Sequence, residues 1–82
     1  MKLIVLTPEK EIFKGEVKSV QVPGINGGFE ILNNHAPIVA ALSSGKVKIV
    51  DVLGLSKVFN IKRGFVEVLK NEVSLLVQGV VE

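Results

Sequence analysis

Turn-forming residues interrupt this sequence at short and fairly regular intervals. Turn signals spaced roughly 8 to 12 residues apart, between runs in which apolar and polar residues alternate, are typical of β-sandwiches and barrels. No long stretch shows the 3.6-residue period of an amphipathic helix. The turns are Thr7-Pro8, Pro23-Gly24, Asn26-Gly27-Gly28, Asn33-Asn34, Ser43-Ser44-Gly45, Leu53-Gly54, Arg63-Gly64 and Lys70-Asn71.

The segments between these turns are rich in β-branched residues, which favour a pleated surface over a helix. Because 82 residues suffice for only one hydrophobic core, residues 1–82 are predicted to form a single domain. The fold class is therefore all-β: a β-sandwich or barrel of about eight to ten short strands. The predicted strands are Lys2–Leu6, Glu11–Val22, Gly28–Leu32, Ile38–Leu42, Lys46–Val52, Ser56–Lys62, Gly64–Leu69 and Glu72–Gln78.

Three details of the alternation predict local geometry. The apolar phase of the longest strand slips near Lys18-Ser19, which predicts a bulge that bends this strand between sheets. A second break, at Ile49-Val50, predicts either a bend or burial on both faces. The polar turn after Leu69 predicts that the last two strands form a hairpin.

Charge and composition argue against several classes of protein. Ten Lys and Arg are interleaved with eight Asp and Glu, so no basic patch for nucleic acid emerges. The four Phe occupy apolar-phase positions and are expected in the core, not as stacking platforms for bases. The longest apolar run, residues 36–42, is far shorter than the roughly 20 residues that span a bilayer. We therefore expect no nucleic-acid binding and no direct membrane insertion.

Candidate chemistry is sparse. The glycine-rich stretch Gly24–Gly28 lacks the Lys-Ser/Thr of a phosphate-binding loop, and Gly24, Asn26 and Gly27 are expected to supply positive φ angles for a tight turn. His35 is the only histidine and there is no cysteine, so we expect no catalytic residue, no metal and no cofactor. The expected role of His35 is to cap a turn before Pro37.

The order of several short motifs resembles that of the epsilon chain of F-type ATP synthases. Each motif alone is weak, but together they cover nearly the whole chain at the spacing of that family. They are Phe13–Val17, Val20–Gly24, Gly27-Gly28, Ile31-Leu32, His35-Ala36-Pro37, Leu42, Gly45, Ile49, Gly64–Val68, Asn71 and Val73.

This resemblance implies a flattened β-sandwich that serves as a non-catalytic rotor subunit in the central stalk. It would contact the gamma chain on one side and the ring of c subunits below, and would help to couple ion translocation to ATP synthesis on the alpha and beta chains. It would lie at the cytoplasmic face of a bacterial inner membrane as a peripheral protein. The residues do not distinguish protons from sodium as the coupling ion.

Two departures from the family pattern matter. Most members continue beyond the position of Gly79 into a helical hairpin that restrains ATP hydrolysis, whereas this sequence ends at Glu82, so we expect no helix-based inhibition. In the loop that the resemblance places near the c ring, the carboxylate has moved to Glu30, and Asn33-Asn34 replace the usual Pro-Gly. The resemblance still implies that Glu30, Asn33, Asn34 and His35 face the ring; the plain alternative is an ordinary polar loop.

Two other functions fit the sequence less well, although the first of them fits the composition equally well. An unrelated β-sandwich that binds a protein or peptide by an exposed strand edge would explain the turns, but not the order of the motifs. A small enzyme or ligand carrier would need convergent polar groups in a pocket, and His35 has no plausible partner nearby in the sequence.

Overall fold

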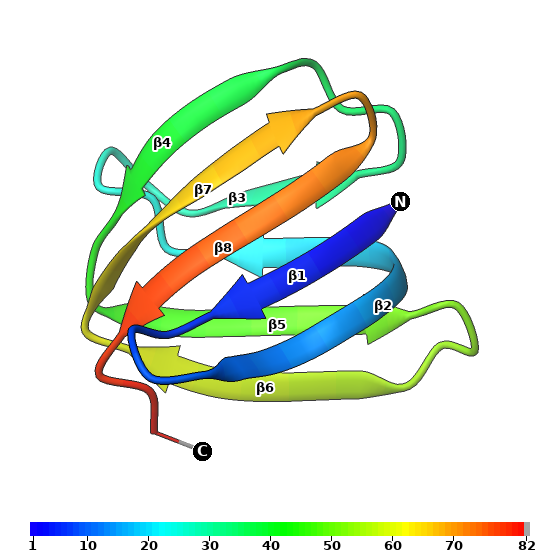
Figure 1. Ribbon diagram of the computed structural model, residues 1–82. Helices are drawn as coiled ribbons and strands as arrows, with labels where there is room; N and C mark the ends of the chain where they lie inside the picture. Colours follow the sequence, from blue (N-terminus) through cyan, green and yellow to red (C-terminus); the bar gives the residue numbers. More distant parts are fainter. Residues whose placement is uncertain (82) are drawn as a thin grey trace.

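The computed structural model describes residues 1–81 and contains eight β-strands (Figure 1). Every strand predicted from the turns is present, and each boundary falls within one residue of its predicted position. The strands are β1 (Lys2–Leu6), β2 (Glu11–Val22), β3 (Phe29–Leu32), β4 (Ile38–Leu42), β5 (Gly45–Asp51), β6 (Ser56–Ile61), β7 (Arg63–Leu69) and β8 (Glu72–Gln78).

The strands form two layers that share β2. The first layer has the order β4-β7-β8-β1-β2, and the second consists of β5, β6, β3 and the later part of β2. Residues 11–16 of β2 pair with β1, whereas residues from Val17 onward pair with β5. β1 pairs antiparallel with β2 and parallel with β8. In Figure 1, β2 curves at the right-hand end as it passes from one layer to the other.

The passage of β2 between the layers confirms the predicted bulge. Its register against β5 shifts between Val17 and Ser19, so Lys18 is the extra residue. At the second phase break, β5 pairs with β6 in an unbroken register from Gly45 to Val50. Ile49 is buried and Val50 is half-buried, so burial on both faces, and not a bend, explains the break.

The core fills the space between the two layers. Among residues 1–81, all seventeen buried side chains of this core are apolar, and Phe59 is the largest of those that are fully buried. The expectation that all four Phe lie in the core is wrong for Phe65, of which 58% is exposed. Because side chains alternate along β7, Val66 and Val68 point inward and Phe65 points outward.

The turns show where left-handed backbone is required. Lys70 (φ 50°) and Asn71 (φ 60°) both have positive φ, which is the geometry of a tight two-residue hairpin, and β7 and β8 pair as predicted. In the glycine-rich turn only Gly27 has a positive φ, of 121°. The prediction was wrong for Gly24 and Asn26, because a single left-handed residue suffices to reverse the chain there. Among residues 1–81, no helix is long and apolar enough to cross a membrane.

Candidate partner-binding surfaces

One end of the sandwich carries four segments, which we call the loop end. It lies on the right of Figure 1 and consists of the start of β1, the β3–β4 loop (residues 33–37), the β5–β6 loop (residues 52–55) and the β7–β8 turn (residues 70–71). Three of these segments, the start of β1, the β3–β4 loop and the β7–β8 turn, are joined by hydrogen bonds between residues that are far apart in the sequence.

Asn33 and Asn71 are the centre of this connection. The Asn71 side-chain amide donates to Asn33 Oδ1 (2.9 Å), and Asn71 Oδ1 accepts from the backbone N–H of Asn34 (2.7 Å). The terminal ammonium of Met1 also donates to Asn33 Oδ1 (3.2 Å) and to the Val17 carbonyl (3.3 Å). This Asn33–Asn71 network therefore fixes the β3–β4 loop against the β7–β8 turn.

The backbone of the β3–β4 loop turns sharply within this network. Asn34 adopts a left-handed φ of 63°, which Asn tolerates better than most residues. The His35 N–H donates to the Leu32 carbonyl (3.1 Å), and the His35 ring nitrogen Nδ1 lies 2.7 Å from the Ala36 carbonyl oxygen. His35 therefore stabilises the turn before Pro37, while the side chains of Asn33 and Asn34 remain exposed.

Glu30 lies apart from the other three residues that were expected to face the ring. It is an exposed residue in β3, where it pairs with Gln21 and accepts a hydrogen bond from Gln21 Nε2 (3.2 Å). An extended strand advances about 3.3 Å per residue, so Glu30 sits about 10 Å along β3 from Asn33. The structure instead places Asn71 beside Asn33 and Asn34. In the sequence, this role was indicated only by the position of Asn71 in a polar turn and among the family-like motifs.

A second candidate surface covers the outer face of the first layer. Leu6, Leu76, Phe65 and Ala41 lie opposite one another in register across β1, β8, β7 and β4. Ile25 adjoins them, because its N–H donates to the Ala41 carbonyl (3.0 Å). We call these five residues the apolar row.

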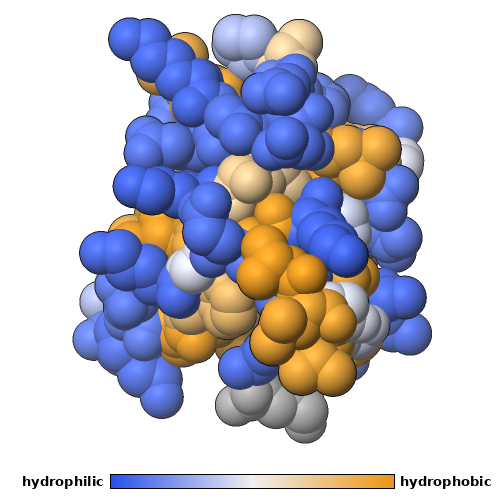
Figure 2. Space-filling view, turned by 90° about the vertical axis from the view of Figure 1, so that its right-hand side faces the viewer, coloured by the Kyte–Doolittle hydropathy of each residue, from blue (hydrophilic) through white to orange (hydrophobic). Residues whose placement is uncertain are grey.

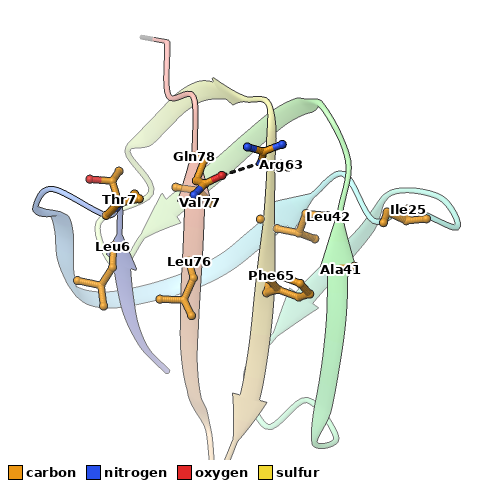
Figure 3. Close-up of a pocket in the computed structure, with 12 residues that line it drawn as sticks. Leu6, Thr7, Ile25, Ala41, Leu42, Arg63, Phe65, Leu76, Val77 and Gln78 are labelled. Atoms are coloured by element: carbon orange, nitrogen blue, oxygen red, sulfur yellow. Dashed lines mark hydrogen bonds between the residues drawn. The ribbon is translucent and has the colours of Figure 1, made fainter.

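The apolar row lines an open hollow of about 540 Å³ (Figure 3). Phe65 is 58% exposed and Leu76 is 51% exposed, so large apolar surface faces outward in the free chain. One border is polar, where Arg63 Nε donates to Gln78 Oε1 (2.6 Å). An apolar centre with a polar rim is the usual anatomy of a protein–protein interface.

The described residues offer little for metal or acid–base chemistry. Within residues 1–81, no group of three or more His, Asp or Glu side chains could hold a metal ion, and no buried residue is polar or charged. What the described part of the chain does present is an apolar face and a rigid polar loop cluster, both suited to contact with other proteins.

Comparison with known proteins identifies close relatives. The 46% identical ATP synthase epsilon chain of Chlorobium limicola matches over 79 residues, which are 96% of this chain and 90% of the relative. The epsilon chain of Caulobacter vibrioides is 43% identical over 77 residues, with 94% and 88% covered. A Leptospira interrogans epsilon chain is 47% identical over 76 residues, but these are only 59% of its length.

Solved structures share the fold. A chain in the central stalk and c-ring structure of the Tetrahymena thermophila mitochondrial ATP synthase superposes with a TM-score of 0.84 at 21% identity, covering 99% of this chain and 65% of that one. A chain of the Euglena gracilis mitochondrial ATP synthase gives 0.90 at 22% identity, with 96% and 51% covered. The family model for the β-sandwich domain of the ATP synthase delta/epsilon chain matches residues 1–82. This chain therefore belongs to the ATP synthase delta/epsilon chain family.

Proposed function

We infer that this chain is the epsilon subunit of an F-type ATP synthase and acts in the central stalk of its rotor. The observation that carries this inference is the match to a bacterial epsilon chain over 90% of that relative's length. The subunit links the gamma chain to the ring of c subunits, and so helps to couple ion translocation to ATP synthesis. An unrelated peptide-binding sandwich is not favoured, because membership of the delta/epsilon chain family already explains the order of the motifs.

The gamma chain is the proposed partner of the apolar row. A subunit that stays attached during rotation needs a permanent interface, and permanent interfaces are more apolar than transient ones. The exposed parts of Phe65, Leu76 and Ile25 supply such a surface on one face of the first layer. The hollow that they line accepts protruding apolar side chains of gamma.

The c ring is the proposed partner of the loop end. Asn33, Asn34 and His35 form the centre of this contact, and Glu30 lies at its margin on the side of β3. The Asn33–Asn71 network supports the proposal because it holds exposed polar groups in one arrangement before binding. Little conformational entropy is then lost when the ring docks.

Within the complex this subunit is non-catalytic, and the alpha and beta chains perform the chemistry. Residues 1–82 act as one rigid adaptor with a gamma-facing side and a ring-facing end. Its proposed location is peripheral, at the cytoplasmic face of a bacterial inner membrane, which is supported by epsilon-chain relatives from Chlorobium and Caulobacter.

The test is to purify the tagged chain from detergent-solubilised membranes of its own source and to identify the co-purifying chains by mass spectrometry. Recovery of gamma, alpha, beta and c chains is the expected result. A matched variant, Phe65→Ser with Leu76→Ser, should recover markedly less of the four chains because its gamma-facing surface is altered, while Val81→Ser, at an exposed position outside that surface, should recover as much as wild type. A folded wild-type chain that recovers none of the four would refute the rotor role.

A further inference from the structure

The loop between β5 and β6 is unusually apolar for a hairpin tip. Turns are normally built from Gly, Asn, Asp, Pro and Ser, but this one presents Val52 (53% exposed), Leu53 (81%) and Leu55 (66%) around Gly54. Figure 2, which faces the loop end, shows a raised group of hydrophobic side chains in its lower half, below the hydrophilic loops at the top. The apolar row, on the outer face of the other layer, does not include these residues.

Hydrogen bonds hold this tip in one conformation. Asp51 Oδ1 accepts from the backbone N–H groups of both Leu53 and Leu55, each at 2.9 Å. The Gly54 N–H donates to the Asp51 carbonyl (3.0 Å), and Gly54 has a left-handed φ of 85°. Leu53 and Leu55 are therefore presented by a fixed loop, so docking them costs little ordering of the backbone.

The position of the β5–β6 loop indicates which partner it contacts. The β5–β6 loop lies at the same end as the β3–β4 loop and the β7–β8 turn (Figure 1). The whole molecule measures only 26 × 24 × 20 Å, so one broad surface that covers the Asn33–Asn71 network also reaches the tip.

We propose that Leu53 and Leu55 form a second, apolar anchor on the c ring, seated between neighbouring loops of the ring. This rests on the proposed function, because it extends the same ring-facing end. Binding to a lipid surface is less well supported: residues 51–57 contain one carboxylate, Asp51, and one ammonium, Lys57, so this segment has no net positive charge to attract anionic headgroups.

Site-directed cross-linking in the assembled complex tests this contact directly. The chain contains no cysteine, so Leu53→Cys introduces its only thiol, which can carry a photoreactive maleimide. The expected product is an adduct with the c chain. His35→Cys tests the proposed function at the same end, and Val81→Cys, at an exposed position outside both surfaces, is the negative control.

The outcomes separate the two ideas. If His35→Cys links to the c chain but Leu53→Cys links to gamma, to lipid or to nothing, the anchor is refuted and the ring-facing role stands. If the wild-type chain does not assemble with an ATP synthase, both fail.

A second measurement uses Leu53→Ser with Leu55→Ser. Both side chains are exposed, so the variant should unfold at the wild-type temperature, yet bind the isolated c ring at least about tenfold more weakly. Unchanged affinity for the ring would overturn the proposal.

Discussion

Phe65→Ala should weaken binding of this chain to the gamma chain without unfolding it. A fully buried Phe removes on the order of 200 Å² from water. Since 58% of Phe65 is exposed in the free chain, roughly 115 Å² remains for a partner to cover. At about 25 cal/mol per Å² this surface contributes up to ~3 kcal/mol, which corresponds to a loss of about 100-fold in affinity.

The assay is titration of the chain into an assembly of alpha, beta and gamma chains prepared without it, followed by calorimetry. The matched control is the next residue, because Val66 is completely buried and faces the core. Val66→Ala should cost about 1 to 3 kcal/mol of stability and leave the affinity of the folded protein nearly unchanged. Phe65→Ala should instead weaken binding to gamma and change the free energy of unfolding by less than about 1 kcal/mol. If Phe65→Ala binds as tightly as wild type, the apolar row is not the gamma-facing surface.

Three further perturbations probe the framework around these surfaces. A Cβ at Gly64 would lie 2.5 Å from the Leu76 carbonyl oxygen, so Gly64→Ala should lower the free energy of unfolding in urea by about 1 to 3 kcal/mol. An unfolding midpoint equal to that of wild type would contradict the tight approach of β7 and β8. Asn71→Gly keeps the left-handed turn but loses two hydrogen bonds, and should cost about 1 to 2 kcal/mol in the same assay, whereas Asn71→Ala adds backbone strain and should cost more. Asp51→Ala should speed amide exchange at Leu53 and Leu55 at least about tenfold by NMR, and unchanged protection would show that Asp51 does not hold the tip.

Strand positions were predictable because their signals are local. Turn residues interrupt the alternation wherever the chain reverses, and a side-chain period of two fixes which residues point inward. The slip at Lys18 was visible for the same reason. Apart from the β7–β8 hairpin, which its polar turn predicted, the neighbours of each strand were not predictable from these patterns, because alternation specifies a buried face and not a partner. The exposure of Phe65 was missed because its apolar character was taken as a sign of burial, although it shares the outward face of β7 with Glu67.

The candidate surfaces were predicted less completely. The family-like motifs located the β3–β4 loop, and the structure places Asn33, Asn34 and His35 together there. Their contact with Asn71 depends on pairing between residues nearly forty positions apart, and no local rule reveals it. Leu53 and Leu55 were assigned only to a turn, because a turn signal says nothing about which side chains remain exposed.

The parallel pairing of β1 with β8 has a consequence for how the molecule acquires its shape. Lys2 lies opposite Glu72, and Leu6 opposite Leu76, so β1 gains this neighbour only after β8 has been synthesised. Until β8 emerges, β1 has only β2 as a neighbour, and a two-stranded hairpin is at best marginally stable in water. Pairing of distant strands costs loop-closure entropy before the contacts between them stabilise the chain, so folding should take milliseconds to seconds. Leu3 and Val5, which are buried in the folded chain, therefore lack part of their cover until β8 is in place, and exposed apolar strands of this kind favour aggregation.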